Sequence, residues 1–183
     1  MAIIITGNPG VGKHTIGKKV SDILKYKILD INKIALESGY YEKKKDSINV
    51  DVKKLKTYLK NKIKKKSIII GHLAPYVVSK NQVENVIILR KNPYKLIPVY
   101  KKRKYSTKKI AENLGSEILG VIAHDSIKKF GKNKSQQIDT TSKTVSKISK
   151  TILKAIDGNF ENDVVDWLSL VNEKNDLKKF FSY

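Results

Sequence analysis

The residues with the clearest chemical signature lie near the N-terminus, where a glycine-rich segment leads into a lysine. Residues 7–15 read G-N-P-G-V-G-K-H-T. Glycines let successive backbone N–H groups turn inward around a phosphate, and the lysine ammonium then reaches the outer phosphates of a nucleotide. We therefore expect nucleotide phosphates to be bound by Gly7, Asn8, Pro9, Gly10, Val11, Gly12, Lys13, His14 and Thr15.

The segments on either side of these glycines are those that such a loop requires. Ala2 to Thr6 is a short isoleucine-rich run that predicts a buried strand, and Gly12 to Leu24 carries apolar residues at helical spacing. A G-x4-G-K loop between a strand and a helix is the P-loop motif. A glycine-rich turn without a ligand is the alternative, and the flanking strand and helix favour the P-loop.

The residue after the lysine departs from the strict motif. That motif has Ser or Thr there as a magnesium ligand, whereas this chain has His14, with Thr15 one place later. Asp30, at the end of the second predicted strand, is a candidate for a substitute carboxylate near the phosphates. A helix cap is the alternative role for Asp30. We expect ATP and Mg²⁺ at this site, with Thr15 and Asp30 as candidate metal ligands.

Strands and helices are predicted to alternate along the rest of the chain. Continuous apolar runs predict further strands at residues 67–70 and 85–89, residues 26–31 are another strand candidate, and residues 136–139 are a candidate for a last strand at a sheet edge. Helical spacing predicts helices at residues 33–38, 52–63, 106–127 and 144–156, and the tail at residues 162–181 holds a further amphipathic helix that contains Trp167. Residues 39–51 have the composition of a polar connection. The pattern indicates an α/β fold of three layers, with a five-stranded parallel sheet flanked by helices.

Length and composition restrict the class of protein. A chain of 183 residues fits one domain with a sizeable core. The absence of cysteine excludes disulfides, cysteine nucleophiles, thiolate metal sites and zinc fingers. The N-terminal apolar run is too short for a signal peptide, and no stretch of the sequence is long enough to span a bilayer. We expect a soluble cytoplasmic protein without a membrane partner.

The chain is strongly basic. It has 38 lysines and arginines against 17 aspartates and glutamates, and the formal net charge of +21 favours polyanionic partners such as nucleotides or RNA. Lysine is spread over the whole chain, so a general compositional bias explains the charge as readily as a nucleic-acid-binding face does. Arginine occurs only at Arg90 and Arg103, which therefore stand out as sites where a forked guanidinium binds phosphate.

Several segments, taken in order, resemble one family. The loop order G-x-P-G-x-G-K-x-T resembles that of adenylate kinases, which have glycine where this chain has His14. The chain also contains IIIGHLAPYV at residues 68–77, IILRKNP at 87–93, KKRKYSTKKIAENLGSEIL at 101–119, QIDTT at 137–141 and VDW at 165–167. Together these segments are similar to the atypical adenylate kinase family called isoenzyme 6 or CINAP, which includes archaeal members. The resemblance covers nearly the whole chain.

The resemblance implies a P-loop kinase fold formed by residues 1–183 as a single domain. It implies a region that binds the nucleoside monophosphate (NMP) at residues 31–63, a lid at residues 103–128 and a helical tail at residues 159–183. Members of the family are described as adenylate kinases with ATPase activity. They are also described as assembly factors for the small ribosomal subunit that engage ribosomal protein uS11.

Three functions are open at this point. The first is phosphoryl transfer from ATP to AMP, which forms two molecules of ADP. The second is an ATP-binding assembly factor for the small ribosomal subunit, with uS11 and small-subunit rRNA as partners and with weak or no kinase turnover. The third is a P-loop kinase that acts on another small substrate.

The resemblance also assigns individual residues. It places catalytic roles on Lys13, His72 and Arg103, because His72 matches a histidine at the end of the third strand and Arg103 matches an arginine of the lid. A structural role at the strand end is the alternative for His72. The loop that packs against adenine contains Asp139 and Thr141, and Arg103 also binds ATP. Residues that bind the acceptor are Asp30, Asn32, Asp51 and His72.

Three positions depart from the family pattern. Ile70 stands where the family has an acidic residue that orients water on magnesium, and an isoleucine side chain can ligate nothing. Val99 stands where members often have an arginine, and Lys104 replaces a glycine beside Tyr105. The sequence therefore predicts the binding of ATP more strongly than its consumption.

Overall fold

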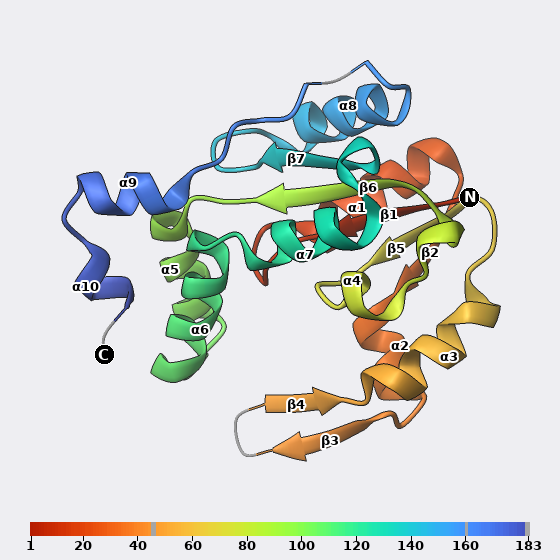
Figure 1. Cartoon of the computed structure of the whole chain (residues 1–183), viewed down its shortest axis with the longest axis horizontal. Helices are drawn as coiled ribbons and strands as arrows, with labels where there is room; N and C mark the ends of the chain where they lie inside the picture. Colours follow the sequence, from red (N-terminus) through yellow and green to blue (C-terminus); the bar gives the residue numbers. More distant parts are fainter. Residues whose placement is uncertain (45–46, 160, 182–183) are drawn as a thin grey trace.

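A parallel sheet of five strands forms the centre of the protein, in the order β2-β5-β1-β6-β7 (Figure 1). The computed structural model describes residues 1–44, 47–159 and 161–181. The strands of the sheet are β1 (Ala2–Thr6), β2 (Lys27–Asp30), β5 (Ser67–Ile70), β6 (Val83–Arg90) and β7 (Ser135–Asp139). The predicted five-stranded parallel sheet is thus confirmed, with β7 at an edge as expected.

β1 is the middle strand, and all of its residues are buried. It pairs in parallel with β5 on one side and with β6 on the other, so that Ile5 lies between Ile70 and Ile87. Because both faces of a parallel sheet are covered, its strands are apolar throughout instead of alternating with polar residues. The loop that follows β1 therefore leaves the sheet at its centre.

Helices cover both faces of the sheet, which gives the three layers of an α/β fold (Figure 1). On one face lie α1 (Lys13–Leu24), α5 (Pro93–Lys102), α6 (Thr107–Ile118) and α8 (Val145–Ile156). On the other face lie α2 (Ile31–Glu37), α3 (Val52–Lys62), α4 (Ala74–Val77) and α7 (Val121–Phe130). Two short 3₁₀ helices, η1 (Lys80–Gln82) and η2 (Lys132–Lys134), precede β6 and β7. Within the described residues, no helix combines the length and the apolar character that crossing a bilayer demands.

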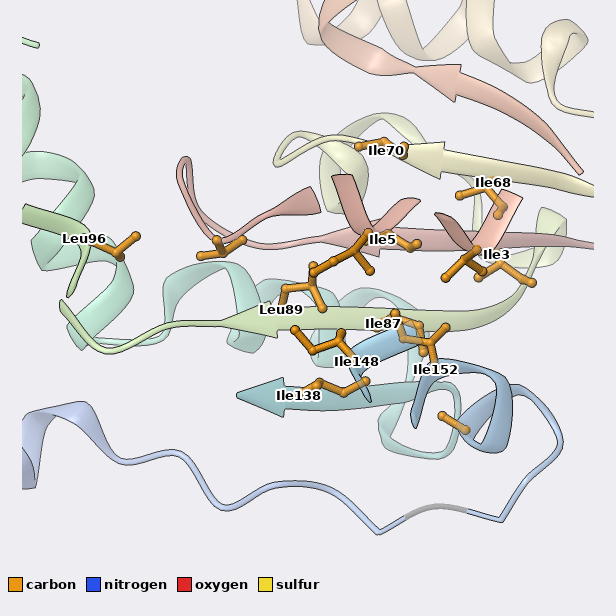
Figure 2. Close-up of a cluster of buried hydrophobic side chains, with 14 of the residues drawn as sticks. Ile3, Ile5, Ile68, Ile70, Ile87, Leu89, Leu96, Ile138, Ile148 and Ile152 are labelled. Atoms are coloured by element: carbon orange, nitrogen blue, oxygen red, sulfur yellow. The ribbon is translucent and has the colours of Figure 1, made fainter. Parts of the chain in front are cut away.

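The core beneath α1 and α8 is built mainly from isoleucine. Figure 2 shows Ile5, Ile87 and Leu89 of the sheet beside Ile148 and Ile152 of α8. The odd-numbered residues of β1 contribute to this cluster, whereas Ala2 and Ile4 contribute to the cluster on the opposite face, as the period of two along a strand requires.

Residues 39–51, expected to be a polar connection, contain a β-hairpin. β3 (Tyr41–Lys44) pairs antiparallel with β4 (Ser47–Val50), and Tyr41 lies opposite Val50. The expectation is wrong here because the alternation of apolar and polar residues extends over only a few positions, Ile48 and Val50 among them. Figure 1 shows the hairpin projecting from the sheet near α2 and α3.

One predicted helix is divided in the structure, and the tail contains two short helices. Residues 106–127 belong to α6 and α7 instead of one helix, because Gly120 adopts a left-handed conformation between them, with φ 64°. Residues 162–181 contain α9 (Trp167–Glu173), which is the helix expected around Trp167, and α10 (Leu177–Phe180), with Asn175 at φ 55° between them. Glycine and asparagine adopt this conformation more readily than other residues, so each ends a helix that periodicity alone would continue.

Substitutions at Gly7 and Gly39 test how closely the backbone packs at the start of the loop that follows β1, because only Gly7 has a close neighbour. Both have positive φ, 132° and 70°, but a Cβ at Gly7 would lie 2.2 Å from the backbone oxygen of Leu89, whereas one at Gly39 would meet nothing within 4 Å. We expect Gly39→Ala to cost about 1 kcal/mol of unfolding free energy. Gly7→Ala should cost about 3 kcal/mol or more, because the backbone itself must move. Urea denaturation followed by circular dichroism measures both, and equal losses would contradict this reading of Gly7.

Candidate active site

A cavity of about 610 Å³ lies beside the glycine-rich loop. Its walls come from that loop, from α2, from β4 and the start of α3, from the residues that follow β5, and from residues 103–113. Four predicted site residues that are distant in the sequence line this one cavity: Lys13, Asn32, His72 and Arg103. Strand ends in an open parallel sheet are the usual place for a ligand, and the cavity occupies this place.

Lys13 is folded over its own loop. Its Nζ donates hydrogen bonds to the backbone oxygens of Gly7, at 2.9 Å, and Asn8, at 2.8 Å. Burial, followed by the positive charge of Arg103, lowers the pKa of Lys13 to about 8. Neutral carbonyl groups compensate a buried ammonium only in part, so an anionic polyphosphate is a better partner for Lys13 than these carbonyls.

Side chains from two other elements hold the loop. The Tyr100 hydroxyl of α5 donates to Pro9 O at 2.7 Å, and the Thr140 hydroxyl is shared between Arg90 O, at 2.9 Å, and Val11 O, at 3.2 Å. The carbonyl oxygens of Pro9 and Val11 are thereby engaged with the protein. The first backbone N–H groups of α1 have no partners within the helix, and such groups bind phosphate when a helix begins at a ligand site.

Positive side chains form one wall of the cavity. Arg103 follows α5, is exposed, and has its Nη1 3.5 Å from the Tyr105 hydroxyl. Lys109 Nζ lies 4.5 Å from the centre of the Tyr105 ring, and that ring stacks on buried Tyr100 with 5.6 Å between the ring centroids. The stacked rings give this cationic wall a rigid base, and the Arg103 guanidinium is available to bind an anion.

His72 follows β5 and is neutral at pH 7. Burial, then the positive charges of Lys13 and Lys109, lower the pKa of His72 to about 4. A neutral imidazole has one N–H donor and one nitrogen acceptor. His72 can therefore orient a water molecule or a phosphate hydroxyl, and it adds no further positive charge to the cavity.

Asp30 has the capping role that was one of its two alternatives, and it also contacts the glycine-rich loop. Its Oδ1 caps α2 by accepting from the backbone N–H groups of Asn32, at 3.0 Å, and Lys33, at 3.2 Å. Its Oδ2 lies 2.7 Å from Nε2 of His14, the residue after the P-loop lysine. Asp30 is thus a helix cap that also reaches the phosphate-binding loop.

The side chains near the loop fit a magnesium ion that is held mainly by phosphates and water. Thr15 is exposed in the cavity, whereas Ile70 is 1% exposed and packs against Gly17 of α1. Within the described residues, no three His, Cys, Asp or Glu side chains are grouped so as to hold a metal ion. Mg²⁺ commonly keeps several waters and takes one or two protein oxygens beside those of a nucleotide, and Thr15 and Asp30 can provide such oxygens.

Arg90 binds the carboxylate of Glu117 and does not line the cavity. It is 4% exposed, its Nε donates to Glu117 Oε1 at 3.0 Å, and its Nη2 donates to the backbone oxygen of Glu117 at 2.7 Å. The interpretation of Arg90 as a phosphate ligand is therefore wrong. The rarity of arginine did indicate a forked contact, but the sequence could not show that a buried glutamate accepts it.

Comparison with known proteins agrees with this geometry. A protein-family model described as "AAA domain" matches residues 3–120, which include the loop and all the residues that line the cavity. A protein named "Putative adenylate kinase" from Pyrococcus furiosus is 33% identical over 176 residues, 94% of each chain. A protein of the same name from Saccharolobus solfataricus is 36% identical over 165 residues, which cover 88% of this chain and 87% of the relative. The chain therefore belongs to the AAA-domain family that this model describes, and its P-loop lies within the matched residues.

Solved structures of low sequence identity share the fold of this P-loop family member. Shikimate kinase from Aquifex aeolicus matches with a TM-score of 0.55 at 19% identity and covers 87% of this chain and 98% of its own. The YorR protein of Bacillus subtilis matches with a TM-score of 0.58 at 18% identity and covers 86% and 96%. The predicted P-loop kinase fold is therefore confirmed.

Seven predicted residues do not line the cavity: Gly7, Asn8 and Val11 of the loop, and Asp30, Asp51, Asp139 and Thr141. Asp51 caps α3 by accepting from the Lys54 N–H at 3.0 Å. Asp139 accepts from the Thr141 N–H at 2.9 Å, and the Thr141 hydroxyl accepts from the Asn92 N–H at 2.9 Å. Asp139 and Thr141 therefore shape the loop after β7, beside Thr140, which contacts the phosphate-binding loop.

Apolar residues of the cavity are a feature that the sequence did not reveal. Leu36 of α2 and Ile48 of β4 line it while 46% and 49% exposed, and Val50, Val52 and Leu73 also contribute. Exposed apolar side chains that gather around a cavity are typical of a site for a flat organic group. Part of this apolar lining belongs to the hairpin, and the short alternation of apolar and polar residues around Ile48 and Val50 was the only indication of it in the sequence.

The lowered pKa of His72 predicts a pH dependence of stability in this P-loop family member. His72 gains a proton near pH 6.5 in the unfolded chain but only near pH 4 in the folded protein. Stability is therefore lost as the pH falls from 6.5 towards 4, by up to about 1.4 kcal/mol per pH unit. Urea denaturation between pH 4.5 and 7.5 measures this slope. We expect His72→Gln to reduce the slope of stability against pH. The control is His124→Gln, at an exposed histidine, and if both variants change the slope equally, His72 is not the source of the pH dependence.

Proposed function

We propose that the protein transfers a phosphoryl group from ATP to AMP, forming two ADP, with an accompanying ATPase activity, as a member of the isoenzyme 6 type of adenylate kinase. The observation that carries the proposal is one cavity that holds Lys13, Arg103 and an exposed apolar wall. Lys13 and Arg103 suit the phosphates of a donor, and the apolar wall suits the base of an acceptor. The names of the archaeal relatives support the same activity.

The acceptor would bind between α2, the hairpin and the start of α3, within residues 31–63. Leu36, Ile48 and Val50 offer apolar contacts to a base, while Asn32 and Asn49 line the same cavity with amide groups. An amide can recognise the edge of a base or a ribose hydroxyl, and the apolar contacts exclude water. This combination favours a nucleoside monophosphate over a small acceptor without a ring.

The donor would place its phosphates on the loop and its adenine near the turn after β7, where Asp139 and Thr141 lie. Residues 103–128 would form the lid region. Only the part of it before Glu117 would move, because Glu117 has no exposed surface and is bound to Arg90. Closure would then bring residues 103–113, with Arg103, Tyr105 and Lys109, over the phosphates and exclude water.

Phosphoryl transfer asks the protein mainly to position the reactants and to stabilise negative charge. Backbone N–H groups of the loop and the Lys13 ammonium would hold the donor phosphates. Arg103 would bind the transferring group, and neutral His72 would orient an acceptor oxygen. Thr15 and Asp30 would hold magnesium, which when bound neutralises part of the phosphate charge.

Adenylate kinase activity is tested by a coupled assay of ADP formation from ATP and AMP. We expect Lys13→Ala to abolish turnover and Arg103→Ala to lower kcat by roughly 100- to 1,000-fold, because each removes charge stabilisation from the transferring group. Lys102→Ala is the matched control, since Lys102 is an exposed cation next to Arg103 that does not line the cavity. It should keep activity within about twofold of the natural chain.

Two results would contradict the proposal in different ways. No turnover above the Lys13→Ala background, in a protein that still binds ATP, would exclude adenylate kinase activity. Turnover with a different acceptor in a panel of nucleoside monophosphates and small alcohols, but not with AMP, would indicate a P-loop kinase for another substrate.

An ATP-binding assembly factor for the small ribosomal subunit is the second candidate. Two observations favour it: the net charge of +21, and buried Ile70 in the place of an acid that would support turnover. In that case, nucleotide binding would change the shape of the lid, and turnover would be weak.

This second function predicts nucleotide-dependent capture of its partner. Purified uS11, or small-subunit rRNA, should be retained by the immobilised protein to a different extent with and without ATP. Lys13→Ala should remove the difference, because it removes the response to ATP and leaves the basic surface almost unchanged. Equal retention by the natural chain and Lys13→Ala under all conditions would leave only non-specific charge attraction.

A further inference from the structure

A buried carboxylate links four segments of the protein that are distant in the sequence. Glu117 of α6 has no exposed surface. Its Oε1 accepts, at 3.0 Å each, from Nε of Arg90, from the backbone N–H of Lys91 and from Nε1 of Trp167. Its Oε2 accepts from Nδ2 of Asn8 at 2.7 Å. The end of β6, the C-terminal tail and the phosphate-binding loop therefore all bind one side chain.

The contact with Asn8 reaches the phosphate-binding loop directly. The Ser116 hydroxyl donates to Asn8 Oδ1 at 2.9 Å, so both ends of the Asn8 amide are held by α6. The backbone oxygen of Asn8 in turn accepts from Lys13 Nζ at 2.8 Å. A displacement of Glu117 would thus move the residue that Lys13 contacts.

The contact with Trp167 belongs to the tail. Trp167 is the first residue of α9, and the tail is also fastened by Val171, which is buried in the core, and by Asp176, which accepts from the Tyr94 hydroxyl at 2.7 Å. Figure 1 shows α9 near the ends of α5 and α6, far along the chain from the N-terminal loop. Trp167 is the only tryptophan in the chain, so tryptophan emission reports on the surroundings of this one side chain.

We propose that Glu117 is a positioning residue through which the docking of the tail at Trp167 sets the affinity of the phosphate-binding loop for nucleotide. The proposal rests on nucleotide binding by that loop. A buried carboxylate requires its donors, so loss of the indole N–H leaves Oε1 with two donors in place of three and shifts the carboxylate relative to Asn8. In the other direction, binding of ATP draws Lys13 away from Asn8 and changes the surroundings of Trp167.

The experiment is a double-mutant cycle on nucleotide affinity. Trp167→Phe keeps most of the ring packing and removes the N–H donor, and Asn8→Ala removes the side chain that contacts Glu117. Affinity for a non-hydrolysable ATP analogue is measured by calorimetry below the melting temperature of each variant. We expect Trp167→Phe to weaken binding by roughly three- to tenfold in the natural chain and by less than about twofold in the Asn8→Ala background. Leu168→Ala is the control, because Leu168 is adjacent to Trp167 and 43% exposed.

A second measurement uses Trp167 itself. Saturating ATP analogue should change the tryptophan emission of the natural chain, and Asn8→Ala should reduce that change even when the nucleotide is saturating. A purely structural role of Trp167 would lower the melting temperature without producing either result.

The outcomes separate the possibilities. A natural chain that does not bind the analogue would overturn the nucleotide-binding role, and this inference with it. Binding by the natural chain together with an unchanged affinity of Trp167→Phe would overturn the inference alone. The same holds if the effects of Trp167→Phe and Asn8→Ala are additive, because the two residues would then act independently.

Discussion

Glu117 is a carboxylate without exposed surface, and because such a group requires hydrogen-bond donors around it, it constrains the phosphate-binding end of the molecule. Its donors come from β6, from the tail and from the loop after β1, and the loop residue lies 109 positions away in the sequence. Arg90 supplies the compensating charge, which makes the pair tolerable in the interior. One side chain therefore connects these elements, and its contact with Asn8 helps to position the glycine-rich loop.

The cavity is lined by three cationic side chains, Lys13, Arg103 and Lys109, and by no carboxylate among the described residues. Burial, and after it the positive charges of Arg103 beside Lys13 and of Lys13 and Lys109 beside His72, lower the pKa values of Lys13 and His72. Burial and like charge thus both penalise the protonated forms of these two side chains when no anion is bound. An entering polyphosphate relieves both effects at once. The same residues that destabilise the folded chain thus favour the binding of an anion, as is common at functional sites.

The sheet and the phosphate-binding loop were predictable because their signals are local. Continuous isoleucine runs indicate covered strands, and the spacing of glycines and lysine needs only nine residues. The hairpin was missed because Ile48 and Val50 alternate over too few positions to give a period. Arg90 was assigned to phosphate because the burial of Glu117, 27 residues away, is a property of the folded chain. Asp30 was a candidate both for a helix cap and for a substitute carboxylate near the phosphates; the structure shows the cap through Oδ1, and Oδ2 contacts His14.

Buried Ile70 bears on the proposed function, in which neutralisation of the phosphate charge would depend on cations more than on an acid that orients water on the metal. Its Cδ1 would lie 2.4 Å from a Cβ at Gly17, so the two residues interlock beneath the first turns of α1. A carboxylate in that place would be desolvated against Ile5 and would lack donors on the apolar side of the helix. The packing of α1 on the sheet has thus closed the position against an acid. Asp30 lies beside Ile70 on the neighbouring strand and contacts His14, and in the proposed function the remaining phosphate charge would fall to Lys13, Arg103 and the backbone amides at the start of α1.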